Sequence, residues 1–351
     1  MPSVLHIVTT AGFAGVERYV CNVAVETASR GWEVAVVGGD GERMHAALEG
    51  RVRCEPGATL IQSVRSVRSL GRWDICHAHM TAAEAVAVFT RPVHRAPIVS
   101  TRHFAARRGA SWAGRIAAPL IGARLTREIA IGEFVAAHLE RVPDSVIVTG
   151  VPESECLWQA GNRTVLVLQR LEAEKDTSTA LRGWEASGLG NDGWSLSVFG
   201  DGSERAELER WVAEQEVAGV TFGGWTDDVA GELGRAGILL ASAPAEPLGL
   251  SVLDAMAAGV PVVASAAGGH LETVGLIPAA PLFPPGDASA AANALRSLRS
   301  ESLRRRLSEA GRQLVAEQFT IGRYTDRLLL EYDAARSVMP TPQAQAVTER
   351  A

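Results

Sequence analysis

The chain is organised around residues 242–261, which read Ser242-Ala-Pro-Ala-Glu246-Pro-Leu-Gly249-Leu-Ser-Val-Leu-Asp254-Ala-Met-Ala-Ala-Gly259-Val-Pro261. The apolar run 238–240 before this stretch predicts a buried strand. From about Gly249 the apolar side chains recur at helical spacing, and Gly259 and Pro261 end that helix. A valine-rich strand follows. Strand, loop, helix and strand in this order predict a parallel sheet covered by helices.

This arrangement places polar groups at the start of a helix. Glu246 lies on the loop before the helix, and Asp254 projects from it about one and a half turns in. Free N–H groups and the positive end of the helix dipole at Gly249 and Leu250 suit a diphosphate, which glycine allows to approach closely. A carboxylate repels phosphate and is better suited to accept hydrogen bonds from sugar hydroxyls. By composition alone, an ordinary strand–loop–helix unit with a solvated glutamate is an equal alternative.

The stretch from Glu246 to Asp254 resembles the Glu-x7-Glu motif of the retaining GT-B glycosyltransferases of the family 4 type. The flanks match as well: Pro-Leu-Gly-Leu follows the first acid, Ala-Met-Ala-Ala-Gly-Val-Pro follows the second, and Gly268-Gly269-x-x-Glu272 comes next. Asp254 departs from the motif because it is one methylene shorter than the family's glutamate. The resemblance implies that Glu246 contacts the donor hexose and that Asp254 contacts the nucleotide ribose, less closely or through water.

Other positions that match the family's motifs lie at strand ends. Arg170 and Lys175 follow a predicted strand at 164–168, where two cations could neutralise a diphosphate and its leaving charge. They match an Arg-Leu-x-x-x-Lys element of the family, with Gln169 in place of its glycine. His103 matches the family histidine that faces the reacting end of the donor sugar. From the residues alone, the alternatives are two surface charges and a histidine that caps a strand.

The resemblance gives catalytic roles to His103, Glu246, Arg170 and Lys175. It implies that Trp225 lies close to the nucleotide base and that Gly15 lies against the donor's phosphate. Gly269 belongs to a nest-like loop whose N–H groups could meet phosphate. From the residues alone, Gly15 is a plain strand-to-helix turn. The full donor-binding set expected is Gly15, Arg170, Lys175, Trp225, Glu246, Leu248, Gly249, Leu250, Asp254 and Gly269.

Both halves of the chain alternate strands and helices, which predicts an α/β fold. The resemblance sharpens this to GT-B, with two Rossmann-like doubly wound domains that face a central cleft. The expected domains are an N-terminal acceptor-side domain at 1–152 and a nucleotide-sugar-binding domain at 153–320. A helix at 321–338 is expected to cross back to the first domain. The tail 339–351 is rich in Pro, Gln and Ala and is expected to be disordered.

Neither a metal nor a bound cofactor is expected. His77 and His79 lie on one face of a predicted strand, but no third ligand is visible, so structural histidines are favoured over a metal pair. The loop 12–15 is not a G-x-G-x-x-G fingerprint, which disfavours a nicotinamide enzyme. The family uses no metal for its chemistry. The resemblance therefore implies metal-independent activity with a nucleotide-diphosphate sugar as co-substrate.

Composition narrows the function classes further. The chain has 351 residues, a net charge of −6 and 47% hydrophobic residues. This balance suits two globular domains and argues against a nucleic-acid binder. The four cysteines are scattered and form no C-x-x-C pair. There is no signal peptide and no apolar run long enough to span a bilayer, so a cytoplasmic protein is expected.

A local basic stretch at 102–127 has no acidic residue. Three interpretations remain open: a solvated helix face, a surface for an anionic acceptor, or attachment to anionic lipid. The first two are favoured equally, and the membrane surface is favoured least. The stretch contains Arg102, Arg107, Arg108, Arg115, Arg124 and Arg127, interleaved with Trp112, Ile116, Leu120, Ile121 and Leu125.

The function that the resemblance implies is hexosyl transfer, an EC 2.4 type of reaction, with retention of the anomeric configuration. The donor would be a UDP- or GDP-type nucleotide sugar, and the acceptor a small molecule or a lipid-linked compound. Two alternatives remain: a nucleotide-sugar epimerase of the same fold, and a non-catalytic nucleotide-sugar-binding protein. Products formed from the donor alone would separate the epimerase, and binding without turnover would identify the binder.

Overall fold

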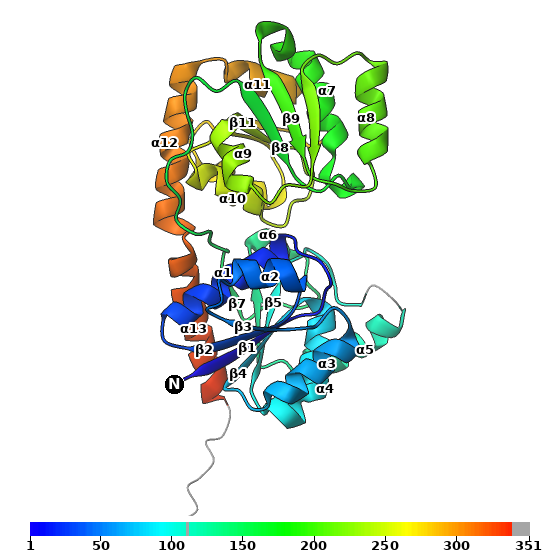
Figure 1. Ribbon diagram of the computed structural model, residues 1–351, viewed down its shortest axis with the longest axis vertical. Helices are drawn as coiled ribbons and strands as arrows, with labels where there is room; N and C mark the ends of the chain where they lie inside the picture. The colour runs from blue at the N-terminus through cyan, green and yellow to red at the C-terminus, as the bar shows by residue number, and fades with distance from the viewer. Residues whose placement is uncertain (110–111, 339–351) are drawn as a thin grey trace, which may run out of the picture.

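The computed structural model describes residues 1–109 and 112–338, and for residues 112 and 113 it describes only the backbone. It contains two α/β units, one above the other in Figure 1, each built on a parallel sheet. The predicted fold class is therefore confirmed. The side chain of Trp112 and the tail 339–351, expected to be disordered, lie outside the described residues.

The N-terminal unit has a seven-stranded sheet in the order β3-β2-β1-β4-β5-β6-β7. Its central strands β1, β4 and β5 are buried along almost their whole length, as expected of parallel strands that helices cover. Every residue from Val4 to Val8 is buried, for example. The strands are β1 (Ser3–Val8), β2 (Glu33–Gly38), β3 (Arg53–Glu55), β4 (Ile75–His79), β5 (Ile98–Arg102), β6 (Arg127–Ala130) and β7 (Ser145–Val146).

Helices connect these strands, and the first of them points its start toward the second unit (Figure 1). That start is fixed by Glu17, whose carboxylate accepts from Ala14 N at 2.8 Å and from Thr10 Oγ1 at 2.7 Å. The carboxylate thus satisfies an amide that a helix end leaves without a partner. The helices are α1 (Gly15–Ser29), α2 (Gly41–Ala47), α3 (Leu60–Leu70), α4 (Met80–His94), α5 (Trp112–Gly122) and α6 (Glu133–Ala137).

The C-terminal unit has a six-stranded parallel sheet in the order β10-β9-β8-β11-β12-β13. Its strands are β8 (Thr164–Leu168), β9 (Ser195–Phe199), β10 (Val220–Gly224), β11 (Ala236–Ala241), β12 (Val262–Ser265) and β13 (Leu282–Phe283). Its α-helices are α7 (Thr177–Ser187), α8 (Arg205–Glu214), α9 (Val229–Arg235), α10 (Leu250–Ala257), α11 (Ala288–Ser297) and α12 (Glu301–Gln318). The unit also contains the short 3-10 helices η1 (Ala173–Lys175), η2 (Leu189–Asp192), η3 (Gly268–His270) and η4 (Val274–Leu276).

The last helix, α13 (Ile321–Ser337), leaves the C-terminal unit and packs against α1, β4 and β5 of the N-terminal unit (Figure 1). Its buried tyrosines join the hydrogen bonds of that core. The Tyr324 hydroxyl bonds the hydroxyl of Tyr19, and the Tyr332 hydroxyl lies 2.6 Å from His77 Nδ1. Helix α13 is therefore part of the core of the N-terminal unit, although it comes last in the sequence.

Candidate active site

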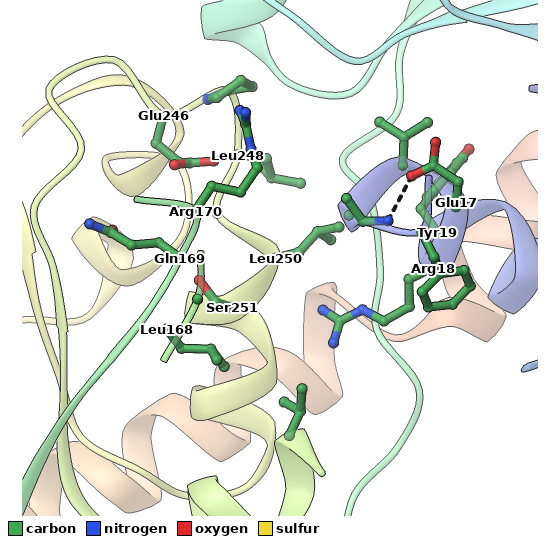
Figure 2. A pocket seen from close by; sticks show the side chains of 18 of the residues that line it. Glu17, Arg18, Tyr19, Leu168, Gln169, Arg170, Glu246, Leu248, Leu250 and Ser251 are labelled. Atoms are coloured by element: carbon green, nitrogen blue, oxygen red, sulfur yellow. Dashed lines mark hydrogen bonds between the residues drawn. The ribbon is translucent and has the colours of Figure 1, made fainter. Parts of the chain in front are cut away.

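A cavity of about 680 Å³ lies in the cleft between the two units. Open α/β sheets bind ligands outside the carboxyl ends of their strands, and the residues after β8 and β11 line this cavity. The start of α1 lines the opposite side (Figure 2). The predicted site residues that line the cavity are Gly15, His103, Arg170, Lys175, Trp225, Glu246, Leu248, Gly249 and Leu250.

The start of α10 faces the cavity with unpaired backbone amides. Gly249 precedes the helix with a φ of +91°, a conformation that favours glycine. The amides of Leu250 and Ser251 have no acceptor within the part of the chain that the structure describes. A Cβ on Gly15 would lie 3.4 Å from Leu250 Cδ1, so α1 and α10 approach closely there. These amides and the helix dipole suit an anion in the cleft.

Glu246 and Lys175 form an ion pair in the wall of the cavity. Lys175 Nζ lies 2.6 Å from Glu246 Oε2, and each side chain is only 16% exposed. The backbone at Lys175 is held in place because its carbonyl accepts from Ser242 Oγ at 3.0 Å and from Gln169 Nε2 at 3.1 Å. The pair places one positive charge and one strong hydrogen-bond acceptor side by side, close to the start of α10.

Arg170 also lines the cavity but is held less firmly. Its Nη2 lies 2.6 Å from Glu174 Oε1, and the side chains of this pair are 50% and 58% exposed. Exposed ion pairs contribute little to stability, so this pair constrains the guanidinium weakly. Arg170 can therefore turn toward an anion in the cleft, whereas Lys175 is already in place.

Asp254, which the resemblance assigns to the ribose, is not among the residues that line the cavity. Its carboxylate pairs with the guanidinium of Arg18 on α1, in the opposite unit. Glu272 makes another contact between the units, accepting from the backbone amides of Glu133 and Phe134 at 2.7 Å and 2.5 Å. Both acids are thus engaged with the N-terminal unit. A ribose that binds Asp254 would have to compete with Arg18.

The backbone amide of Gly269, which was expected to meet phosphate, is already paired within the protein. Gly269 N donates to the carbonyl of Glu246 at 2.7 Å, which satisfies a backbone acceptor beside the cleft. The loop containing Gly269 therefore holds the backbone of Glu246. The side chain that this loop contributes to the cavity is His270, which the sequence analysis did not single out.

Three buried histidines form a chain that ends at the cavity. His6 Nδ1 lies 3.0 Å from His79 Nε2, and His79 Nδ1 lies 3.1 Å from His103 Nε2. Burial lowers the pKa of His6 and of His103 to about 3, and it lowers the pKa of His79 well below its usual value. All three rings are therefore neutral near neutral pH.

The direction of the hydrogen bonds in this chain decides what His103 offers to a ligand. A neutral imidazole has one N–H, so the donors point either toward the cavity or away from it. His6 Nε2 is buried without a partner, and it would be an orphan N–H if the donors pointed away from the cavity. Buried orphan N–H groups are rare. The favoured order therefore leaves Nδ1–H of His103 to donate to a ligand in the cleft.

His6, His77 and His79 are also the one group of metal-ligand residues found within 1–109 and 112–338, with ring nitrogens within 4.8 Å of one another. The sequence analysis missed His6, because only the pairing of β1 with β4 brings it to the other two. Both nitrogens of His77 have partners of their own: Tyr332 Oη at 2.6 Å and Thr101 Oγ1 at 2.8 Å. These hydrogen bonds support a structural role for the cluster.

The structure buries some arginines of the basic stretch 102–127 and leaves others exposed. Arg102 and Arg108 are buried, and they pair with Glu84, Glu128 and Glu140, which lie outside the stretch in the sequence. None of the three interpretations fits these two arginines, because their charges are neutralised inside the protein. The exposed arginines of the stretch are Arg107, Arg115 and Arg124.

The surface beside these exposed arginines is partly apolar. Ile116 and Leu120 lie one turn apart on α5 and are 65% and 71% exposed. A helix with enough length and apolarity to cross a membrane does not occur among residues 1–109 and 112–338. The three interpretations of the basic stretch thus apply only to its exposed part.

The fold and the cleft define the class of protein. Two parallel-sheet α/β domains that face a cleft are the GT-B architecture of glycosyltransferases. The family profile described as Glycosyltransferase Family 4 matches residues 13–155, and the profile described as Glycosyl transferases group 1 matches residues 155–314. The chain belongs to the GT-B glycosyltransferases of the family 4 type, as its sequence motif predicts.

Two curated relatives are similar to parts of the chain. The lipopolysaccharide core biosynthesis glycosyltransferase LpsE of Rhizobium meliloti is 33% identical over 136 residues, which are 38% of this chain and 40% of that protein. The 2-deoxystreptamine glucosyltransferase of Streptomyces kanamyceticus is 31% identical over 186 residues, which are 50% of this chain and 47% of that protein. The chain therefore spans less than half the length of these relatives.

Solved structures resemble nearly the whole chain. Anabaena HepE in complex with UDP-glucose has a TM-score of 0.76 and 18% identity, and the match covers 95% of this chain and 99% of that one. Sucrose-phosphate synthase from Thermosynechococcus elongatus has a TM-score of 0.74 and 19% identity, with 97% and 100% covered. At these identities the likeness shows the fold.

Proposed function

We propose that this protein transfers a sugar from a nucleotide-diphosphate sugar to an acceptor, with retention at the anomeric carbon. The observation that carries the proposal is the Lys175–Glu246 pair, 2.6 Å apart beside the unpaired amides of α10. One cavity thus combines a cation and helix N–H groups for a diphosphate with an acceptor for sugar hydroxyls. The complexes of Anabaena HepE with UDP and with UDP-glucose support a UDP-type donor over a GDP-type donor.

Five of the cavity residues have a defined role in this proposal. The diphosphate lies at the start of α10, where Lys175 and Arg170 neutralise the charge that grows as the bond to the sugar breaks. Glu246 accepts hydrogen bonds from the hexose and so fixes the position of the anomeric carbon. His103 donates from Nδ1 at the reacting face. Trp225 lies beside the nucleotide base.

Retention requires either a nucleophilic side chain or attack on the face from which the diphosphate leaves. Among the described residues, five carboxylates line the cavity, and each already has a partner within the protein: Glu17, Asp201, Asp227, Asp228 and Glu246. None of them is a free nucleophile, which favours front-face transfer. The bond between the anomeric carbon and phosphate oxygen breaks, the acceptor oxygen bonds that carbon, and the leaving phosphate takes the acceptor proton.

The acceptor in this proposal is a small molecule or a lipid-linked compound that enters from the N-terminal side of the cleft. That side contributes the start of α1, Met80 and the segment His103–Phe104 to the cavity lining. Phe104 is 46% exposed and gives this side an apolar surface beside the histidine. An acceptor with an apolar portion would therefore find a contact there.

The decisive experiment is a screen of UDP- and GDP-sugars by thermal shift, followed by a transfer assay with the donor that binds. Proton NMR of the product reports the anomeric configuration, and retention is expected. Conversion of the donor without acceptor would instead identify an epimerase. Binding with no turnover across a broad acceptor set would identify a binding protein. An inverted product would contradict the front-face mechanism.

Lys175→Ala should weaken binding of the nucleoside diphosphate about tenfold and lower kcat by roughly 10²-fold, because the cation interacts most strongly with the charge of the transition state. Arg170→Ala removes the more exposed cation and should cost less in both quantities. Calorimetry with the free diphosphate and kcat with the full donor measure the two effects. Wild-type kcat in Lys175→Ala would place this lysine outside the reaction.

Turnover should survive removal of divalent cations. The sequence has no Asp-x-Asp element of the kind that holds a metal–diphosphate complex. Lys175, Arg170 and the start of α10 offer positive charge in its place. The measurement is kcat after dialysis against EDTA, compared with the same sample supplied with Mg²⁺ or Mn²⁺. Complete loss in EDTA that either ion restores would contradict this expectation.

A further inference from the structure

His270 is a cavity residue to which the proposed reaction gives no role. It is 1% exposed, yet it lines the cavity. It ends the 3-10 turn η3, the loop whose Gly269 amide holds the carbonyl of Glu246. The histidine and the glutamate are therefore fixed to each other through the backbone.

Hydrogen bonds determine which nitrogen of His270 carries the proton. Nδ1 lies 3.0 Å from Ser265 Oγ and 3.2 Å from the carbonyl oxygen of Ser265. Ser265 Oγ donates its one proton to the carbonyl of Ala243, and a carbonyl only accepts. Nδ1 must therefore be the donor. In the neutral ring, Nε2 is then left as an acceptor.

Several effects act on the protonation of this ring. Burial lowers the pKa of His270, and Lys175 lowers it too, whereas Glu246 and the hydrogen bond to the Ser265 carbonyl raise it. The net direction is downward, so the ring is neutral near neutral pH. The positive end of α10 also disfavours a cation at this place.

The acceptor nitrogen lies beside Glu246 at the start of α10. A Cβ built on Gly249 would lie 3.4 Å from His270 Nε2, 3.2 Å from its Cδ2 and 3.5 Å from Glu246 Cγ. The imidazole and the stem of the glutamate thus border the small space that glycine leaves open. No hydrogen-bond partner of Nε2 is found in the described residues, nor is it among the buried atoms that lack one.

We propose that His270 is a second sugar-recognition residue, whose Nε2 accepts a hydrogen bond from one hydroxyl of the donor hexose. This inference rests on the proposed function. An unprotonated nitrogen cannot donate to phosphate, whereas it suits a hydroxyl that lies next to one bound by Glu246. The donor class is then a hexose with two free neighbouring hydroxyls that face α10. A buried acceptor rejects an analogue without the hydroxyl, because the acceptor would lose its partner.

The test compares kcat/KM of the wild type and of His270→Leu, each with the intact donor and with a set of monodeoxy donors. The four values for one hydroxyl form a thermodynamic cycle. In the wild type, one deoxy position should lower kcat/KM roughly 10- to 100-fold. In His270→Leu, the intact donor should lose a similar factor, and removal of that same hydroxyl should cost nothing further. Affinity for free UDP should be unchanged.

His138→Leu is the matched control. This exposed histidine also bonds a backbone carbonyl through Nδ1, 2.7 Å from Phe134 O, and it does not line the cavity. It should retain the wild-type response to every deoxy donor. If every deoxy donor lowered kcat/KM by the same factor in His270→Leu as in the wild type, the histidine and the hydroxyls would act independently. That result would overturn the proposal. A fall in UDP affinity as large as the fall for the intact donor would overturn it too, because His270 would then be a phosphate ligand.

A measurement on the wild type keeps the proposal testable if His270→Leu does not fold. In protein labelled with ¹⁵N-histidine, the intact donor should shift the Nε2 resonance of His270, and UDP alone should leave it in place. Equal shifts with both ligands would contradict a sugar contact. A wild type that turns over a donor without these effects disproves only the role of His270. A wild type that binds no nucleotide sugar disproves the proposed function, and this inference with it.

Discussion

Glu246→Ala should lower kcat with the full donor by roughly 10²-fold or more, because a small displacement of the anomeric carbon breaks the reactive alignment. The affinity for free nucleoside diphosphate should stay near the wild-type value. Glu246 pairs with Lys175, and the substitution leaves that cation and the start of α10 in place. The two measurements are calorimetry with the diphosphate and kcat with the donor, in a variant shown to be folded.

Glu209→Ala is the matched control for this result. Glu209 also pairs with a cation, Arg205, at 2.8 Å, but it lies outside the cavity lining. Its kcat should equal that of the wild type. A Glu246→Ala variant with normal kcat would remove Glu246 from the active site, and the assignment of the cleft as a hexose site would lose its main support.

Arg108→Ala should destabilise the N-terminal unit by about 3–5 kcal/mol, the range measured when one partner of a buried ion pair is removed. The Arg108 side chain is 1% exposed and pairs with Glu84, Glu128 and Glu140. Burial alone would raise the pKa of Glu128, but hydrogen bonds from Arg141, Arg102 and Arg108 and the charge of Arg108 lower it overall. Without Arg108 these carboxylates lose a shared, desolvated counterion.

Arg107→Ala provides the comparison, since Arg107 is the preceding residue and is exposed. Its stability should stay close to that of the wild type. Denaturant unfolding, with native-state hydrogen exchange of β5 and β6, locates the loss in the N-terminal unit. Equal stability of the two variants would mean that the ion pairs of Arg108 do not stabilise the N-terminal unit. An unchanged acceptor KM and unchanged binding to anionic lipid vesicles in folded Arg108→Ala would separate this structural role from acceptor or lipid binding.

The local part of the site could be predicted from the sequence. Prolines, a glycine and helical spacing place Glu246 before a helix and Gly249 at its start, and the structure has α10 at Leu250–Ala257. Arg170 and Lys175 follow a strand, as their spacing indicates. These features depend on nearest neighbours in the chain. Local rules of capping, turns and periodicity are therefore enough to find them.

Pairings between distant segments could not be predicted in the same way. Asp254 pairs with Arg18, which lies in the other unit. Arg108 of the stretch 102–127 pairs with Glu84, an acid outside that stretch. His6 joins His79 only because β1 and β4 are neighbours in the sheet. Such contacts follow from strand order and domain packing. The charge pattern of one segment does not contain that information.

Helix α13 has a consequence for how the protein folds as it is synthesised. The C-terminal unit is continuous in the sequence from β8 to α12, so its core can close as soon as that segment leaves the ribosome. The N-terminal unit, by contrast, requires Tyr324, Leu328 and Tyr332 of α13 in its own core. At typical synthesis rates the first domain made would wait roughly ten to forty seconds for its last helix. During that interval the apolar face beside α1 that α13 later covers stays exposed to solvent.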